Sequence, residues 1–209
     1  MKNNYIIIGD SIVYGIGDYK DNGWTSMLKN RIINMDNSIN SNNYVHIIGF
    51  PGATSKDIAL KTSSILDTFA FEGVCNKIIL SVGINDTQTT SYLYDYELQK
   101  VSINEFQKNI ENIINLSKKY SSNIIILGLT RIYSDTKYEL KSGRYIENKT
   151  IEKYDLLLKN ICNRYDVDYI EMADLLFNED YIDTIHPNNS GHRKIYNRVK
   201  TKILYSSKK

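Results

Sequence analysis

The chain has 209 residues, of which 42% are hydrophobic and 24% charged, so it is long enough for one domain with a sizeable core. Its 26 basic and 24 acidic residues alternate along the sequence, which excludes the basic blocks of a nucleic-acid or anionic-membrane binder. No apolar run approaches the roughly 20 residues that span a bilayer, and the start resembles no signal peptide. We expect one domain over residues 1–209, cytoplasmic unless a leader has been trimmed, monomeric by default, and without a nucleic-acid partner or membrane-spanning segment.

Short, nearly continuous apolar runs recur along the chain and are typical of strands buried on both faces of a parallel sheet. We predict five such strands, at 5–8, 44–48, 77–82, 123–129 and 167–170. Stretches with helical spacing lie between them, at 24–35, 55–69, 97–120 and 151–165, and a last helix is predicted at about 189–204. This alternation predicts right-handed crossovers and a doubly wound α/β sheet with helices on both faces.

Two segments fit the alternation poorly, 87–97 and 131–146. Both follow predicted strands and are rich in Tyr, Ser, Thr and charged residues. They are expected to be long loops, either lid-like insertions beside a site or ordinary surface loops. The two cysteines, Cys75 and Cys162, lack C-x-x-C spacing and have no histidine nearby in sequence, so neither a metal site nor a disulfide framework is expected.

Polar residues follow several of the predicted strands, at the edge where ligand sites of open parallel sheets form. Ser11 comes after the first strand, Gly52 after the second and Asn85 after the third, while Asp183 and His186 lie beyond the fifth. We expect these residues to meet in one crevice despite their separation in the sequence.

A serine hydroxyl needs a neighbouring base to act as a nucleophile, and imidazole is the usual one. Of the three histidines, His46 lies inside the second predicted strand and is expected to be a satisfied structural residue. His192 lies in the last predicted helix, where a surface or packing role is expected. His186 differs, because Asp183 precedes it by three residues and Pro187 restricts its backbone to extended conformations. Asp183 would fix its tautomer and stabilise the imidazolium formed when Ser11 loses its proton.

The charge that develops on a substrate carbonyl oxygen needs hydrogen-bond donors aimed at it beforehand. The sequence offers the backbone N–H groups of Ser11 and Gly52 and the side-chain amide of Asn85. A glycine at position 52 lets the backbone approach the reacting atoms closely. Asp10 and Asp86 are interpreted as turn or capping carboxylates. The first loop, 9–15, contains neither a G-x-G-x-x-G fingerprint nor a Walker lysine, which argues against a phosphate-binding protein.

At these residues the chain resembles the SGNH hydrolases, also called the GDSL-type esterases and lipases. The resemblance rests on four blocks in order: Gly9-Asp10-Ser11-Ile12, Pro51-Gly52-Ala53-Thr54, Gly83-Ile84-Asn85-Asp86 and Asp183-Thr184-Ile185-His186-Pro187. Ile12 stands where the family name has leucine, which is a conservative departure. The resemblance implies a flavodoxin-like three-layer α/β/α sandwich with a mostly parallel five-stranded sheet, ester hydrolysis through an acyl-enzyme, and no metal or organic cofactor.

Carried over by position, the resemblance makes Ser11 the nucleophile and His186 the base, oriented by Asp183, while Ser11, Gly52 and Asn85 form the oxyanion hole. A short-chain acyl or acetyl ester, on a carbohydrate, is the leading expectation, because the sequence has no long hydrophobic lid segment. Acyl transfer, cleavage of a lysophospholipid or thioester, and a non-catalytic binding module stay open as alternatives. The aromatic residues expected to line the cleft are Tyr14, Trp24, Tyr92, Tyr94, Tyr96 and Tyr133.

Overall fold

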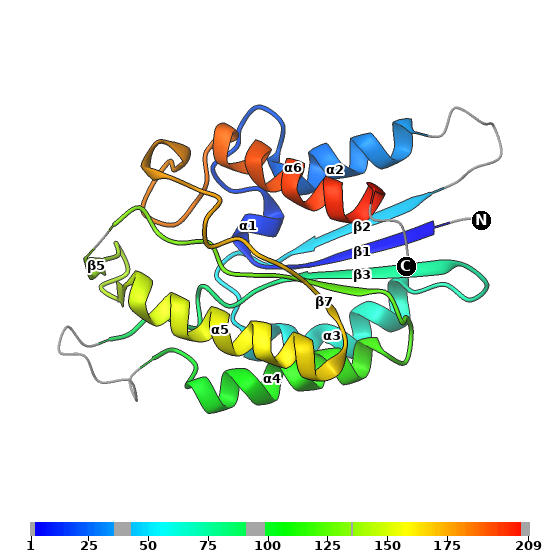
Figure 1. Ribbon diagram of the computed structural model, residues 1–209, viewed down its shortest axis with the longest axis horizontal. Helices are drawn as coiled ribbons and strands as arrows, with labels where there is room; N and C mark the ends of the chain where they lie inside the picture. Colours follow the sequence, from blue (N-terminus) through cyan, green and yellow to red (C-terminus); the bar gives the residue numbers. More distant parts are fainter. Residues whose placement is uncertain (1–2, 36–42, 91–98, 135, 206–209) are drawn as a thin grey trace.

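A five-stranded parallel sheet forms the centre of the computed structural model, which describes residues 3–35, 43–90, 99–134 and 136–205 (Figure 1). The strand order is β2-β1-β3-β4-β7, and every neighbouring pair is parallel. All five predicted strands are present, as β1 (Asn3–Gly9), β2 (Tyr44–Gly49), β3 (Cys75–Ser81), β4 (Ile124–Leu127) and β7 (Asp168–Ile170). This order is that of flavodoxin-like proteins, as predicted, and its switch point lies between β1 and β3.

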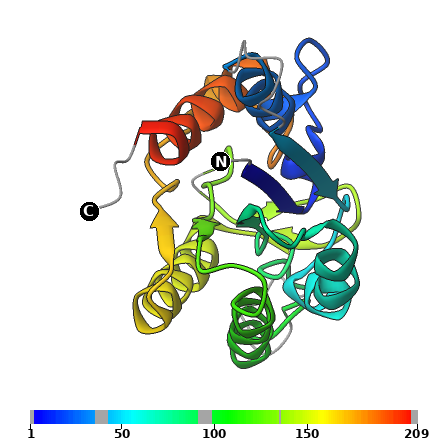
Figure 2. The ribbon, with the colours of Figure 1, turned by 90° about the vertical axis from the view of Figure 1, so that its right-hand side faces the viewer.

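Helices cover both faces of the sheet and give the three predicted layers (Figures 1 and 2). On one face lie the short α1 (Ser11–Tyr14), α2 (Gly23–Asn34) and α6 (Asn189–Tyr205). On the other lie α3 (Ser55–Phe69), α4 (Ile103–Ser117) and α5 (Asn148–Tyr165). The prediction of a helix from residue 97 is wrong for the described residues 99–102, because the Ser102 side chain accepts the N–H of Glu105 and begins α4 there.

The end of β1 leaves room for nothing larger than glycine. The central strand side chains Ile6, Ile7 and Ile8 are fully buried, as expected for a strand covered on both faces. A Cβ at Gly9 would lie 2.1 Å from the carbonyl oxygen of Ser81 on β3. This close approach brings the chain that leaves β1 next to the chain that leaves β3.

The segment 131–146, predicted as a loop, contains a small antiparallel hairpin. Its strands are β5 (Tyr138–Glu139) and β6 (Tyr145–Ile146). Thr89, in the segment that follows β3, pairs with Tyr145 on one side and Gln99 on the other. The hairpin is therefore tied by backbone hydrogen bonds to the chain that leaves the central sheet. Of the other predicted loop, residues 91–97 lie outside the described part of the chain.

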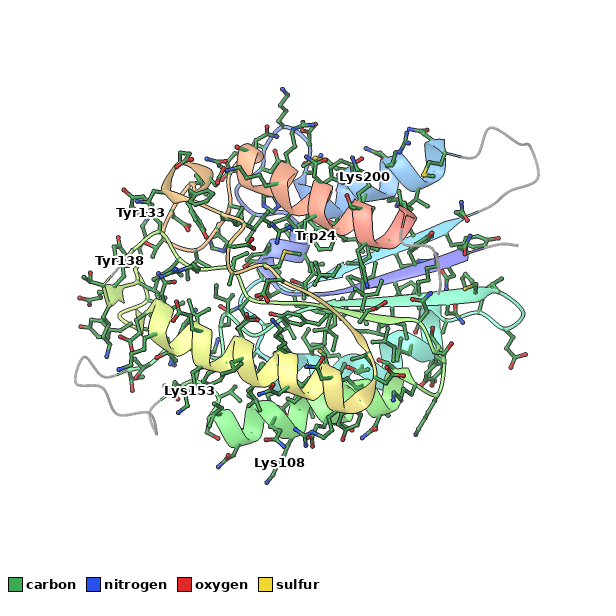
Figure 3. The ribbon with its side chains drawn as sticks, viewed as in Figure 1. Trp24, Lys108, Tyr133, Tyr138, Lys153 and Lys200 are labelled. Carbon is green, nitrogen blue, oxygen red and sulfur yellow. The ribbon has the colours of Figure 1, made fainter. Side chains whose placement is uncertain are left out.

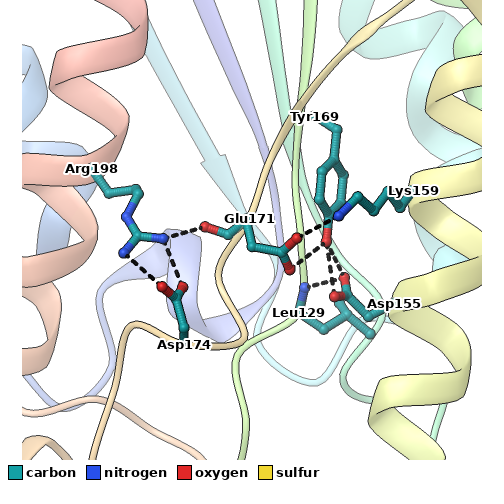
Figure 4. Close-up of polar contacts among 7 residues, drawn as sticks. All are labelled: Leu129, Asp155, Lys159, Tyr169, Glu171, Asp174 and Arg198. Carbon is teal, nitrogen blue, oxygen red and sulfur yellow. Dashed lines mark hydrogen bonds and ion pairs between the residues drawn. The ribbon is translucent and has the colours of Figure 1, made fainter.

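A polar cluster fixes the end of β4, from which the chain leads toward the hairpin (Figure 4). The buried carboxylate of Asp155 accepts hydrogen bonds from the N–H of Leu129 and the hydroxyl of Tyr169, both at 2.8 Å. Burial raises the pKa of Asp155. A Cβ at Gly128 would lie 2.3 Å from the Tyr169 hydroxyl oxygen, so a larger residue there would displace this hydroxyl from Asp155. The cluster thus joins β4, α5 and β7 at the edge of the sheet that carries the candidate site.

Candidate active site

Ser11 lies at the first position of α1, two residues after the end of β1, and is only 4% exposed. Asp10 caps this helix, because its carboxylate accepts the N–H of Ile12 at 2.9 Å. The capping role predicted for Asp10 is therefore what the structure shows. The sharp turn from strand to helix places the Ser11 hydroxyl at the carboxyl edge of the sheet.

The histidine of the last sequence block contacts the Ser11 hydroxyl, and the aspartate of the same block contacts that histidine. The Nε2 atom of His186 lies 3.0 Å from the Oγ of Ser11, and its Nδ1 lies 2.8 Å from Oδ2 of Asp183. The other carboxylate oxygen, Oδ1, accepts the backbone N–H groups of Ile185 at 2.8 Å and His186 at 2.7 Å. One continuous chain of contacts thus joins Ser11 to His186, which lies 175 positions later in the sequence, and to Asp183, which lies 172 positions later.

The local turn explains why the aspartate and the histidine face each other. The N–H of Ile182 donates to the carbonyl of His186 at 3.0 Å, and Tyr181 pairs with Pro187 across the turn. Burial by itself raises the pKa of Asp183, but hydrogen bonds from the backbone and ring of His186 and from Ile185 hold that pKa below its usual range. Asp183 is therefore ionised at neutral pH and oriented before any substrate binds.

The two other histidines lie elsewhere. His192 is fully buried, where Nδ1 accepts the N–H of Trp24 at 3.3 Å and Nε2 lies 3.0 Å from the carbonyl oxygen of Ile16. Its predicted role is confirmed as packing rather than surface. His46 packs against Phe69 at 4.7 Å between ring centroids, but its buried Nε2 has no hydrogen-bond partner among the described residues. The expectation that His46 is satisfied is therefore wrong for this nitrogen.

Asn85 follows β3 and lines a pocket together with His186. Its Nδ2 donates to the carbonyl of Ala53 at 3.0 Å, and its Oδ1 accepts from Nε2 of Gln88 at 3.0 Å. Gln88, which the sequence patterns did not single out, is 7% exposed and lines the same pocket. Gln88 is a polar residue three positions after Asn85, directly after a turn, and this spacing could have indicated a contact between the two side chains.

Gly52 is connected only indirectly to the catalytic candidates Ser11, Asp183 and His186. No hydrogen bond among the described residues links it to Ser11, Asp183 or His186, and its contact with the group runs through the neighbouring Ala53, which Asn85 holds. The Gly52 carbonyl accepts the ammonium of Lys100 at 3.1 Å. Its φ of +77° requires glycine, whereas a Cβ would meet nothing within 4 Å. Position 52 therefore requires glycine because of its backbone conformation, and not because any other described residue approaches it closely.

The backbone N–H groups of Ser11 and Gly52 find no acceptor among the described residues. The second hydrogen of Asn85 Nδ2 likewise has none in that part of the chain. Free donors at the carboxyl edge of a sheet are what an oxyanion site requires. The structure thus leaves available the donors that the sequence blocks indicated.

Asp86 anchors the start of α3 beneath this site. Its carboxylate accepts both the N–H of Ser55, at 2.9 Å, and the hydroxyl of Ser55, at 2.5 Å. Burial raises the pKa of Asp86 to about 7, against the effect of these hydrogen bonds, and the nearby Asp10 adds to the rise. Burial also raises the pKa of Asp10, to about 6. The scaffolding role predicted for Asp86 is borne out by these contacts.

The raised pKa of Asp86 predicts a pH-dependent stability. Between about pH 4 and pH 7 the folded protein holds a proton that the unfolded chain has released, so the free energy of unfolding falls as the pH rises through this window. Asp86→Asn is expected to make this fall shallower, as measured by urea unfolding at several pH values. Asp57→Asn is the control, because hydrogen bonds from Thr54 lower the pKa of Asp57 and its carboxyl titrates below the window. Parallel curves for wild type and Asp86→Asn would contradict the assignment.

A cavity of about 700 Å³ opens beside His186. The hairpin provides Tyr138, Glu139 and Lys141, and further walls come from Tyr133 and Tyr181. Segment 131–146 therefore lies beside the site, as one of the two sequence-based alternatives proposed. Figure 3 shows Tyr133 and Tyr138 near one end of the molecule and Trp24 in its interior.

The aromatic predictions for the cleft are confirmed only in part. Tyr133 lines the cavity, but Trp24 is fully buried in the core and the expectation for it is wrong. Tyr14 is 62% exposed and is not among the cavity walls. The remaining tyrosines, at 92, 94 and 96, lie outside the described residues.

Within the described ranges, no group of three or more His, Cys, Asp or Glu side chains is arranged to hold a metal ion. None of the helices in that part of the chain is both long and apolar enough to cross a membrane.

Comparisons with known proteins agree with this fold. One solved structure that is similar is an acetylxylan esterase from Geobacillus stearothermophilus, with 16% identity and a TM-score of 0.72 over 97% of this chain and 94% of that chain. Variants of that enzyme described as catalytic mutants replace a serine, a histidine or an aspartate by alanine. Another is an α/β hydrolase enzyme from the metagenome of Lake Arreo, Spain, with 18% identity and a TM-score of 0.70 over 95% and 93%. No curated protein sequence matches the chain.

Fold and family together define a carboxylic ester hydrolase built on a flavodoxin-like sheet. The chain belongs to the GDSL-like Lipase/Acylhydrolase family, whose model matches residues 7–194. The family resemblance inferred from the four sequence blocks is therefore confirmed.

Proposed function

We propose that the protein is a serine esterase that hydrolyses short-chain acyl esters, with Ser11 as nucleophile, His186 as general base and acid, and Asp183 as the residue that orients His186. The observation that carries the proposal is the unbroken series of contacts from Ser11 Oγ to His186 Nε2, at 3.0 Å, and from His186 Nδ1 to Asp183 Oδ2, at 2.8 Å. The related acetylxylan esterase, whose catalytic mutants replace the same three residue types, supports it.

In the acylation step, the Ser11 oxygen forms a bond to the ester carbonyl carbon while Nε2 of His186 takes the hydroxyl proton. Asp183 accepts a hydrogen bond from Nδ1–H of His186, which leaves the Nε2 lone pair directed at Ser11. The same carboxylate stabilises the imidazolium that results. The tetrahedral intermediate then breaks its bond to the leaving oxygen, and His186 returns the proton to that oxygen. An alcohol leaves and Ser11 carries the acyl group.

The negative oxygen of the intermediate would be bound by three donors, the N–H groups of Ser11 and Gly52 and the Nδ2 of Asn85. The proposal is supported by the lack of a competing acceptor for these hydrogens among the described residues. In the second step His186 removes a proton from water, whose oxygen attacks the acyl carbon, and the bond to Ser11 breaks. An acid is released and the Ser11 hydroxyl is restored.

We infer a polar alcohol portion for the substrate, with a carbohydrate as the leading class. The cavity beside His186 is lined by the three tyrosines Tyr133, Tyr138 and Tyr181 and by both signs of charge, Glu139 and Lys141. Tyrosine rings offer stacking faces and hydroxyls to a sugar, whereas a long acyl chain requires a continuous apolar wall. The related acetylxylan esterase acts on a polymer of this class.

The proposal is tested by trapping the acyl-enzyme. Acid quenching during turnover of p-nitrophenyl acetate, followed by peptide mass spectrometry, is expected to find one acetyl group on the peptide that contains Ser11. Rates over a series from acetate to long-chain esters should be highest for acetate or butyrate. A long-chain optimum would contradict the short-chain assignment and favour lipids. If an added sugar were acetylated faster than free acetic acid is released, the protein would be an acyltransferase. If the Ser11 peptide carried no acetyl group and no ester were consumed, the protein would be a binding module.

A further inference from the structure

We propose that Gln88 is a positioning residue that sets which way the side-chain amide of Asn85 faces, and so keeps an N–H of Asn85 available to the substrate oxyanion. The inference rests on the proposed function, because it assumes that Asn85 is an oxyanion donor. It adds to that function a residue outside the four sequence blocks.

The orientation of the Asn85 amide follows from the chemistry of its neighbours. The carbonyl oxygen of Ala53 can only accept a hydrogen bond, so the Asn85 atom 3.0 Å from it must be the nitrogen Nδ2. The other end of the amide is then Oδ1, which faces Gln88 at 3.0 Å and needs a donor there. The Nε2 of Gln88 supplies that donor. The two contacts together select one of the two orientations that the amide could take.

Gln88 is itself held firmly enough to act in this way. Its side chain is 7% exposed, and its backbone carbonyl accepts the N–H of Lys100 at 2.7 Å. The next residue, Thr89, exchanges two backbone hydrogen bonds with Tyr145 of the hairpin, both at 2.8 Å. The Gln88 side chain therefore has a fixed place between Asn85 and the hairpin that lines the cavity.

Loss of the Gln88 donor leaves Oδ1 of Asn85, at a 6% exposed position, without a partner. A buried acceptor without a partner is costly, so the amide gains orientations in which Nδ2 no longer presents its second hydrogen to the substrate. Because this hydrogen acts on charge that develops in the transition state, the loss falls on kcat rather than on KM.

The first test replaces the donor by a side chain of similar length. Gln88→Met is expected to lower kcat for p-nitrophenyl acetate by about 10-fold, with KM nearly unchanged. Gln107→Met is the matched control, because Gln107 donates to Glu111 on α4 and is not among the cavity walls; its kcat should be that of wild type. A Gln88→Met enzyme with wild-type kcat would overturn the proposal.

The second test distinguishes orientation from simple packing. In Gln88→Glu the new carboxylate cannot donate to Oδ1, whereas its protonated form can, and burial raises the pKa of a carboxyl at this position. The ratio of the kcat of Gln88→Glu to that of wild type is therefore expected to rise as the pH falls. The other charged or titratable groups of the cavity occur in both enzymes, so taking the ratio removes the effect that they share. These groups include Glu139, Lys141, Asp183 and His186. A ratio that does not change with pH would overturn the proposal.

A double-variant measurement separates this inference from the function on which it rests. If Gln88 acts through Asn85, then Gln88→Met should cost little further kcat in an Asn85→Ala enzyme. If the losses of kcat from Gln88→Met and Asn85→Ala were fully additive, the positioning role of Gln88 would be contradicted, whereas the proposed oxyanion role of Asn85 would not be. An Asn85→Ala enzyme with wild-type kcat would instead contradict the oxyanion role of Asn85 in the proposed function.

Discussion

The substitution Ser11→Ala is expected to lower kcat for ester hydrolysis by about 10⁶-fold. The hydroxyl of Ser11 is the group that forms the covalent bond to the substrate. Its oxygen lies 3.0 Å from Nε2 of His186, and it supplies the proton that His186 takes in the acylation step. The free energy of unfolding should change by no more than about 1 kcal/mol, because only one oxygen atom is removed and no backbone contact depends on it. Steady-state kinetics on p-nitrophenyl acetate and urea unfolding measure the two effects.

Ser63→Ala is the matched control for this variant. Ser63 lies on the exposed face of α3, where its hydroxyl contacts Asp67 at 3.4 Å, and it belongs to none of the four blocks. Its substitution should leave kcat unchanged. Turnover by Ser11→Ala within about 10-fold of wild type, after removal of contaminating esterases, would show that Ser11 is not the nucleophile.

The fold was predictable because the signals for it are local. Each strand is an apolar run, such as Ile6 to Ile8, that must be covered on both faces, and alternation with helices then leaves few topologies. The beginning of α4 was less predictable. It depends on a capping contact between Ser102 and Glu105, which competes with apolar spacing that continues further toward the N-terminus.

The candidate site was predictable to the extent that its residues follow strand ends. Ser11, Asn85 and the turn from Asp183 to His186 could be placed on one edge by the topology alone. Gln88 and Trp24 show the limit of this argument. The contact of Gln88 with Asn85 depends on loop dihedral angles, and the burial of Trp24 depends on how α2 is rotated against the sheet, which the sequence pattern did not specify.

The substitution Asp183→Asn tests the second part of the mechanism, the choice of tautomer on His186. The Oδ1 of Asp183 accepts two backbone N–H groups, from Ile185 at 2.8 Å and His186 at 2.7 Å, so in Asp183→Asn the oxygen must stay at that place. The atom that faces His186 Nδ1 then becomes an NH₂ group, which donates. Nδ1 has to accept, and the ring proton moves to Nε2.

With a proton on Nε2, His186 can no longer take the proton of Ser11, although every contact distance is preserved. Asp183→Asn is therefore expected to lower kcat by about 10⁴-fold, with little change in KM or in the free energy of unfolding. Nitrogen-15 NMR of the imidazole should show the proton on Nδ1 in wild type and on Nε2 in the variant. Asp174→Asn is the control, since Asp174 is an exposed partner of Arg198 and its loss should not affect kcat. A variant at position 183 that keeps both the wild-type tautomer and the wild-type rate would mean that Asp183 holds the turn in place but does not set the proton of His186.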